Sequence, residues 1–263
     1  MRIYLGIDDT DTVDSEIGTG KLARRFAGRL NAGSRLIGVV RQQLPLREDI
    51  PYTSHNSAAC LIVDWPAEVA VERLVTTVVE YLEDHFQPGS DPGLCVAGAD
   101  ERAMAALTAF GWRCASEPVT QKEAIAAAAA GAHLSGHGGT NDGIIGAAAA
   151  VGLTASGWSG RFIEWGDLRH LPRQMSVADL QRHSIEVMSV DRDAAVPAAA
   201  DRVDTRNWAR PRLIGNRPVL LVKPSGPGMW ENIGEKRKKR TSNVQRSAFN
   251  GCLFRPPPSG RAG

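Results

Sequence analysis

An apolar run that ends in a cluster of acids opens this chain. The segment RIYLGI, residues 2–7, has the length and apolar character of a buried strand, and Asp8, Asp9 and Asp11 follow it at once. A strand that ends in acids places them at the edge of a sheet, where α/β proteins bind ligands. Three carboxylates this close need a cation, most simply Mg²⁺, which takes one or two carboxylates together with phosphate oxygens. The alternative is a solvated acidic loop in which Asp8 serves as a cap.

Two glycine-rich segments stand at predicted helix starts. The first is Gly18, Thr19, Gly20 and Lys21, and the second contains Gly136, Gly138, Gly139, Asp142 and Gly143. A helix N-terminus presents N–H groups that suit a phosphate, and glycine lets the backbone approach it closely. The first segment is not a P-loop, because Leu22 follows Lys21 where that motif has Ser or Thr. A plain helix cap and a close-packed glycine turn are the alternatives.

A third polar segment leads into a predicted strand. Its side chains are those of Tyr52, Thr53, Ser54, His55 and Asn56. Such a run at the start of a strand predicts binding of a polar substrate, with His55 either a functional or a structural histidine.

The composition indicates a soluble globular protein. The chain has 263 residues, of which 43% are hydrophobic and 23% charged. It contains no apolar run of membrane-spanning length and no signal-peptide pattern at its start, so we expect a cytoplasmic protein without a membrane partner. Its four cysteines are widely scattered, which predicts buried thiols and no zinc site.

The charge is unevenly distributed. Residues 231–263 carry eight Lys or Arg against two Asp or Glu, whereas the whole chain has a formal net charge of +2. This tail is rich in Gly, Pro and Ser as well, so we expect it to be disordered. It is either merely solvated or a non-specific contact for RNA phosphates.

Hydrophobic periodicity predicts an α/β chain. Strands are expected at residues 34–44, 57–65, 93–98 and 112–119, and helices at 19–31, 67–86, 101–111 and 122–132. A small-residue helix should follow the second glycine loop. Further on, we expect a strand within 155–165, a short helix capped by Ser176, a linker over 191–204 and a hairpin within 210–224.

These motifs together resemble one family, the archaeal isoleucine-tRNA agmatinylcytidine synthetases, or TiaS. The resemblance covers about residues 1–170 and is carried by GIDDTD, the Gly18–Thr19 helix start, the segment 51–59, the DPG turn at 91–93 and the GIIGAAAAVG helix start. The chain departs from the family in having YTSHN where a more basic form stands. The OB-fold and zinc ribbon of the family also have no counterpart in its sequence.

The resemblance implies a fold, a kinase-like α/β domain interrupted by a ferredoxin-like α+β insert with a short C-terminal extension. The corresponding ranges are 1–57 with 130–195 for the ATP-binding domain and 58–129 for the insert. A hairpin extension over 196–230 and the basic tail over 231–263 complete the division.

The resemblance also implies chemistry. ATP with Mg²⁺ would phosphorylate a cytosine oxygen of a tRNA, and the amine of agmatine would displace the phosphate. By position, Asp8, Asp9 and Asp11 would hold Mg²⁺, Thr19 matches a phosphorylatable threonine, and the second glycine loop would contact phosphates. Three alternatives stay open: an ATP-dependent phosphotransferase or ligase acting on a small metabolite or another amine, a non-catalytic nucleotide- or RNA-binding protein, and a dehalogenase-like phosphatase with Asp9 as nucleophile and Asp11 as acid.

Overall fold

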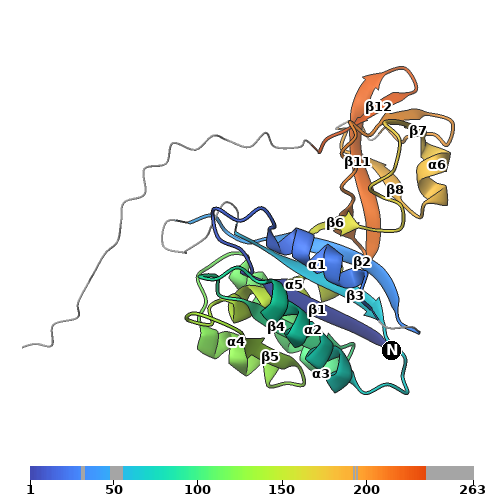
Figure 1. The fold of residues 1–263 in the computed structure, drawn as a ribbon. Helices are drawn as coiled ribbons and strands as arrows, with labels where there is room; N and C mark the ends of the chain where they lie inside the picture. The colour runs from blue at the N-terminus through green and yellow to red at the C-terminus, as the bar shows by residue number, and fades with distance from the viewer. Residues whose placement is uncertain (31–32, 48–55, 192, 194, 235–263) are drawn as a thin grey trace, which may run out of the picture.

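The structure is a computed structural model that describes residues 1–30, 33–47, 56–191, 193 and 195–234 (Figure 1). The chain is a mixed α/β protein in which one large sheet runs through the described residues. The sheet has the strand order β5-β4-β1-β3-β2-β6-β10-β11-β12-β9-β7, and β8 pairs with β11. All but the first four residues of the predicted basic tail lie outside the described residues.

The N-terminal part of the sheet contains five strands before β6. They are β1 (Arg2–Asp8), β2 (Arg35–Gln43), β3 (Ser57–Asp64), β4 (Gly93–Gly98) and β5 (His133–Gly136). β1 pairs in antiparallel fashion with both β3 and β4, and β3 pairs with β2 in the same way. The chain thus follows β1-α1-β2-β3-α2-β4 with the strand order β4-β1-β3-β2, which is a split β-α-β pattern.

Helices cover both faces of these strands. One face carries α1 (Thr19–Ala27) and α2 (Val71–His85), whose apolar residues share a core with Ile3, Leu5 and Ile7 of β1. The other face carries α5 (Gly143–Ala155), with α3 (Glu101–Cys114) and α4 (Gln121–Ala128) packed against α5. Burial on both faces explains why β1, β3 and β4 are nearly continuous apolar runs rather than alternating ones.

Small residues let α5 lie very close to the sheet. A Cβ added at Gly6 of β1 would meet the Ala147 carbonyl oxygen of α5 at 2.1 Å, and one at Gly152 of α5 would meet the Leu107 carbonyl oxygen of α3 at 1.8 Å. α5 is therefore enclosed on all sides, which agrees with its apolar composition around the whole helix.

The C-terminal part continues the sheet beyond β2. It consists of β6 (Arg161–Glu164), β7 (Gln174–Ser176), α6 (Val177–Arg182), β8 (Glu186–Ser189), β9 (Arg202–Asp204), β10 (Arg212–Ile214), β11 (Arg217–Gly226) and β12 (Met229–Asn232). Figure 1 shows α6 and most of these strands gathered at one end of the molecule, joined to the rest through β2 and β6. Val40 and Ile62 of the N-terminal part share a core with Phe162 and Leu220, so the two parts are packed together.

Several elements agree with the sequence prediction. The small-residue helix, the hairpin of β10 and β11, and the short helix α6 are all present, and Ser176 caps α6 in a capping box with Asp179. Cys60, Cys95 and Cys114 are buried free thiols, as expected. No helix in the described part of the chain is long and apolar enough to cross a membrane.

The strand predicted at residues 112–119 is wrong. α3 continues to Cys114, and a turn precedes α4. Gly111, the last residue of the predicted helix, lies inside α3, where a Cβ would be 3.0 Å from the Ala149 carbonyl oxygen of α5. The predicted linker also contains β9, which pairs with β12. The strand pairing does not confirm a separate insert over residues 58–129, because β3 and β4 both pair with β1.

Candidate functional site

The sequence motifs converge on one edge of the sheet. Asp8, the last residue of β1, is paired with Gly93 at the start of β4, and Gly93 is paired with Gly136 at the end of β5. The end of β2 is likewise paired with Ser57 at the start of β3. We call this edge, with Asp8, Asp9, Asp11, Asp91 and Asp142, the acid edge. The strands beside β1 are antiparallel, so β1, β2 and β5 end here while β3 and β4 begin here.

Asp8 is held against the start of α5. A Cβ added at Gly146 would lie 1.7 Å from the Asp8 Oδ2 atom, so the carboxylate occupies the space that any larger residue would need. Burial, followed by the charge of Asp9, raises the pKa of Asp8 to about 7. The carboxylate therefore sits in a place where its negative charge is disfavoured unless a positive group arrives.

Asp9 stands in a strained conformation at the centre of the acid edge. Its φ is 49°, in the left-handed region that few residues other than glycine adopt. Burial raises its pKa to about 6, and the carboxylates of Asp91, Asp11 and Asp142 contribute to this rise. Backbone strain and crowded like charges at one residue are typical of functional sites.

Asp91 is the acid that the predicted site did not include. It lies in the turn before β4, and the Thr140 hydroxyl donates to its Oδ2 atom at 2.5 Å. The DPG turn at residues 91–93 was recognised as part of a motif, but nothing in the local sequence indicates that this turn faces the end of β1. Only the pairing of β4 with β1 brings Asp91 to Asp9.

Asp11 and Thr19 are joined by two hydrogen bonds. The Thr19 backbone N–H and its hydroxyl both donate to Asp11 Oδ1 at 2.9 Å. The Thr19 oxygen accepts from the Thr10 hydroxyl at 3.2 Å and from the Thr10 N–H at 3.3 Å. Thr19 is only 5% exposed. In this arrangement Thr19 fixes the loop after β1 to the start of α1, and its hydroxyl would have to leave these bonds to take a phosphoryl group.

The first glycine segment forms the start of α1 at the same edge. Gly18 is extended, with φ −81° and ψ 162°, and its carbonyl accepts from the N–H groups of Lys21 and Leu22. A Cβ at Gly20 would lie 3.1 Å from Ile163 of β6, so α1 starts close to β6. The Lys21 side chain is exposed.

The second glycine loop wraps around Asp91. Gly139 has a φ of 53°, and a Cβ there would be 1.8 Å from Asp91 Oδ1. A Cβ at Gly143 would be 2.0 Å from the Asp91 carbonyl oxygen, and one at Gly136 would be 2.3 Å from Asn141 Oδ1. Close packing thus accounts for these three glycines, while a Cβ at Gly138 would come no closer than 3.2 Å to its neighbours. The loop nevertheless brings the start of α5 to the acid edge.

Asp142 joins this edge at the start of α5. Its Oδ1 atom accepts from Gln121 Nε2 at 2.6 Å, and its Oδ2 atom lies 2.9 Å from the Thr140 hydroxyl. Thr140 thus lies between the carboxylates of Asp91 and Asp142.

The third polar segment is only partly described. Tyr52, Thr53, Ser54 and His55 lie outside the described residues. Asn56 lies at the same edge, where its Nδ2 donates to the Pro45 carbonyl at 2.8 Å and its own carbonyl accepts from the Leu44 N–H. Asn56 thus holds residues 44 and 45 beside the start of β3.

The donor set fits a nucleotide-bound metal better than a protein-enclosed one. Within the described ranges, no group of three or more His, Cys, Asp or Glu side chains is arranged to hold a metal ion. Mg²⁺ does not require such a group, because it commonly binds one or two carboxylates and completes its shell with phosphate oxygens and water. Asp8 and Asp9, whose charges are disfavoured without a partner, fit that description.

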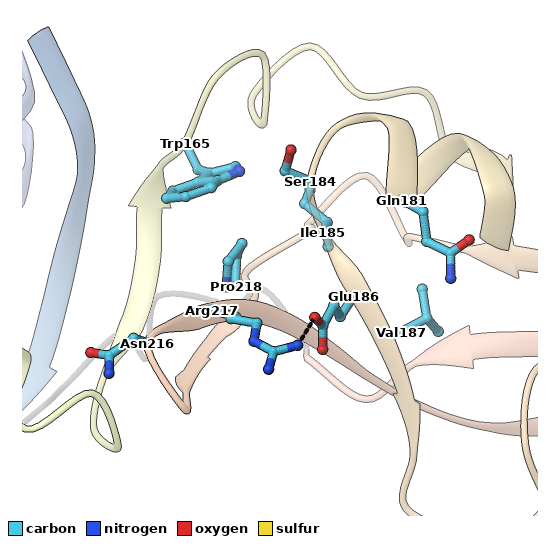
Figure 2. A pocket seen from close by; sticks show the side chains of 9 residues that line it. All are labelled: Trp165, Gln181, Ser184, Ile185, Glu186, Val187, Asn216, Arg217 and Pro218. Carbon is cyan, nitrogen blue, oxygen red and sulfur yellow. Dashed lines mark hydrogen bonds and ion pairs between the residues drawn. The ribbon is translucent and has the colours of Figure 1, made fainter.

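A pocket of about 580 Å³ lies elsewhere, in the C-terminal part. Figure 2 shows it between β6, β8 and the turn from β10 to β11, with Trp165 on one side and the ion pair of Arg217 and Glu186 on the other. The nitrogen–oxygen distance of this pair is 2.6 Å. No residue of the acid edge lines this pocket, and the sequence did not predict it.

The fold and the acid edge describe a mixed α/β protein in which acids and two glycine-rich helix starts share one end of the sheet. The chain is similar to solved structures of TiaS. Apo TiaS, an isoleucine-tRNA agmatidine synthetase, is 27% identical with a TM-score of 0.49, over 58% of this chain and 35% of that one. The complex of TiaS with its isoleucine tRNA and ATP is 28% identical with a TM-score of 0.49, over 58% of this chain and 36% of that one.

A third structure, TiaS with its isoleucine tRNA, AMPCPP and agmatine, is 26% identical with a TM-score of 0.47, over 58% and 36% of the two chains. This chain thus spans about a third of the length of the structures it matches. No protein-family model and no curated protein matches it. The family to which these structures belong is the one that the sequence motifs indicate.

Proposed function

We propose that this protein is an ATP-using enzyme that activates its substrate by phosphoryl transfer at the acid edge. The observation that carries the proposal is the convergence of the GIDDTD strand end, the Gly18–Lys21 helix start and the Gly136–Gly143 loop at one end of the sheet. The first two segments are close in the sequence, but the third is more than a hundred residues further on, and a shared triphosphate would explain why all three meet here.

The electrostatics of the acid edge support a cationic ligand. The raised pKa values of Asp8 and Asp9 mean that their negative charges are under-compensated in the folded protein. When bound with ATP, Mg²⁺ would neutralise phosphate charge, and Asp8 and Asp9 are the residues that would hold it. Asp91 and Asp142 would add negative charge near Asp9. The starts of α1 and α5 offer backbone N–H groups and a partial positive charge to the phosphate oxygens.

Positioning is the main task left to the protein in such a reaction. Asp11 and the Thr10–Thr19 pair would fix the loop that carries Asp9, whose φ of 49° lies in the left-handed region. A phosphorylated Thr19 would require this loop to open first, because the hydroxyl is buried and bonded.

For the substrate we propose an RNA cytidine and an amine, as in the proteins that the motifs resemble. The γ-phosphoryl group would move from ATP to a carbonyl oxygen of the base, breaking its bond to the bridging oxygen and releasing ADP. The amine nitrogen would then bond to the ring carbon that carries this oxygen. The oxygen would leave with the phosphate, and the nitrogen would lose a proton. Arg41, Arg161 and Arg212 lie opposite one another on β2, β6 and β10, and such cations favour a polyanionic acceptor over a small neutral metabolite.

Thermal unfolding with ligands tests this proposal. Wild-type protein should gain stability from ATP in the presence of Mg²⁺ and much less from ATP with EDTA, and Asp8→Asn should remove the Mg²⁺-dependent part. Incubation with ATP, agmatine and bulk tRNA should give an RNA that incorporates labelled agmatine. Binding of ATP that is independent of both Mg²⁺ and Asp8, or binding without any turnover, would contradict the enzyme and favour a nucleotide-binding accessory protein.

A further inference from the structure

Arginine side chains from several elements gather around β6, beside the acid edge. We propose that they bind the phosphodiester backbone of an RNA. We call the group the arginine surface, and it consists of Arg24 of α1, Arg41 of β2, Arg161 of β6, Arg169 after β6, Arg210 just before β10 and Arg212 of β10. This proposal rests on the proposed function, since it names where the RNA substrate of that enzyme would lie.

Three of these arginines form a row across adjacent strands. Arg161 of β6 is directly opposite Arg41 of β2 on one side and Arg212 of β10 on the other. Directly opposite residues point to the same face of a sheet, so three like charges stand side by side at intervals of about 5 Å. Val39, two residues before Arg41, packs in the core shared with α1, so the row is on the face that carries α1.

The other three arginines form a cluster at the side of α1. Arg24 Nη1 lies 3.6 Å from Glu164 Oε2, and their side chains are only 21% and 23% exposed. Arg210 lies over the ring of Trp208, with its Cζ atom 3.9 Å from the ring centroid. Glu164 supplies the carboxylate that pairs with this cluster, and it pairs with Arg24 at a distance too long for a strong hydrogen bond.

The charges of this cluster remain incompletely balanced. Burial lowers the pKa of Arg24, and the neighbouring charge of Arg169 lowers it further. Burial also lowers the pKa of Arg210 to about 10, followed by the charges of Arg169 and Arg24, while Glu164 acts in the opposite direction. An anion placed among these guanidinium groups would relieve their mutual repulsion.

The chemistry favours RNA over other anions. Guanidinium groups match the geometry of phosphate oxygens, and an extended row of them suits a chain of phosphates better than a single ion. Trp158 precedes β6, is 64% exposed and lies beside Gly215 in the turn between β10 and β11. An exposed indole suits base stacking, which an acidic protein or free phosphate would not use. Arg41 lies two residues before the end of β2 at the acid edge, so this surface adjoins the acid edge.

A charge-matched pair of double variants tests the proposal. Arg169 and Arg212 are exposed, so Arg169→Gln with Arg212→Gln removes two positive charges with little effect on the fold. The control is Arg73→Gln with Arg102→Gln, which removes two exposed charges from α2 and α3. Binding of full-length proteins to fluorescent bulk tRNA and to an unstructured RNA of about 20 nucleotides, a length above the site size of common single-strand binders, is measured by anisotropy from low to moderate salt.

We expect the arginine-surface variant to lose roughly 20-fold in affinity near 0.1 M salt. The slope of log affinity against log salt concentration should become shallower by about 1.4, because each of the two lost phosphate contacts contributes about 0.7 on a single strand. The control should bind like wild type, and Trp158→Ala should weaken RNA binding without changing the slope. No RNA binding by the wild type, an equal loss in both double variants, or no loss in either would overturn the proposal. So would equal competition by polyglutamate or inorganic polyphosphate, which would assign the surface to an acidic protein or to phosphate.

Thermal stabilisation by ATP and Mg²⁺, measured on the same samples, separates this proposal from the proposed function. RNA binding that depends on the arginine surface in a protein without ATP binding would defeat the proposed enzyme and leave the RNA surface standing. ATP binding that persists in the arginine-surface variant while RNA binding fails is the outcome that supports both.

Discussion

Replacing Asp9 by asparagine removes one charge from the acid edge and preserves its shape. Asp9 has a φ of 49°, and asparagine is among the few residues besides glycine that adopt this left-handed conformation readily. The substitution therefore changes charge without adding backbone strain.

The expected change in the free energy of unfolding follows from the pKa of Asp9. Burial and the carboxylates of Asp91, Asp11 and Asp142 raise it from 3.8 to about 6. A carboxyl group whose pKa is raised by folding reduces stability as the pH rises above its unfolded pKa, and the full reduction is present above the folded pKa. The difference corresponds to about 3 kcal/mol, which the partial exposure of this side chain reduces to roughly 1–2 kcal/mol.

We expect Asp9→Asn to increase the free energy of unfolding by that amount at about pH 8, and to give no gain near pH 3, where the carboxyl group is protonated in both states. Urea titrations at these two pH values and at about pH 6 measure this dependence, with Asp84→Asn on the exposed side of α2 as a matched control. A gain that is absent at the highest pH, or the same at the highest and lowest pH, would refute the electrostatic reasoning.

Three further predictions concern Gly146 and Thr19 at this edge. Gly146→Ala should lower stability by about 1–3 kcal/mol in thermal unfolding, because its Cβ would meet Asp8 Oδ2 at 1.7 Å, whereas Gly28→Ala, whose Cβ would be 3.5 Å from the Arg25 carbonyl oxygen, should be tolerated. Thr19→Val should cost about 1–3 kcal/mol, because it removes the hydroxyl that donates to Asp11 and accepts from Thr10 and leaves only the backbone N–H bond to Asp11, while Thr19→Ser should restore most of it; equal unfolding of the two variants would remove this role. Mass spectrometry after incubation with ATP and Mg²⁺ should find phosphate on Thr19 if it carries the group in transit, and an active enzyme with unmodified Thr19 would exclude that step.

Local sequence patterns predicted the secondary structure of segments whose conformation depends on residues close in the sequence. The apolar run before Asp8, the small-residue helix after Gly143 and the capping box at Ser176 are each set by a few neighbouring residues. The wrong strand after Gly111 shows the limit of this approach. A glycine required for contact between two helices has the same local appearance as a glycine that ends one.

Strand pairing could not be read from the sequence. The pairing of β4 with β1 joins residues 93–98 to residues 3–8, and no local pattern in either segment indicates it. The same pairing adds Asp91 to the acid edge. The arginine row was also hidden, because Arg41, Arg161 and Arg212 are separated by long stretches and meet only through the register of three strands.

Transfer of the γ-phosphoryl group is the measurement that tests the central claim most directly. Wild-type protein, Asp9→Asn and the control Asp84→Asn are each incubated with γ-labelled ATP, Mg²⁺, agmatine and bulk tRNA, and the labelled products are separated over time. We predict Mg²⁺-dependent loss of the γ-phosphoryl group from ATP in the wild type and the control, with a rate lower by about 10²-fold or more in Asp9→Asn. ATP consumption by Asp9→Asn at the wild-type rate, or no consumption by the wild type, would contradict a phosphoryl-transfer site at the acid edge.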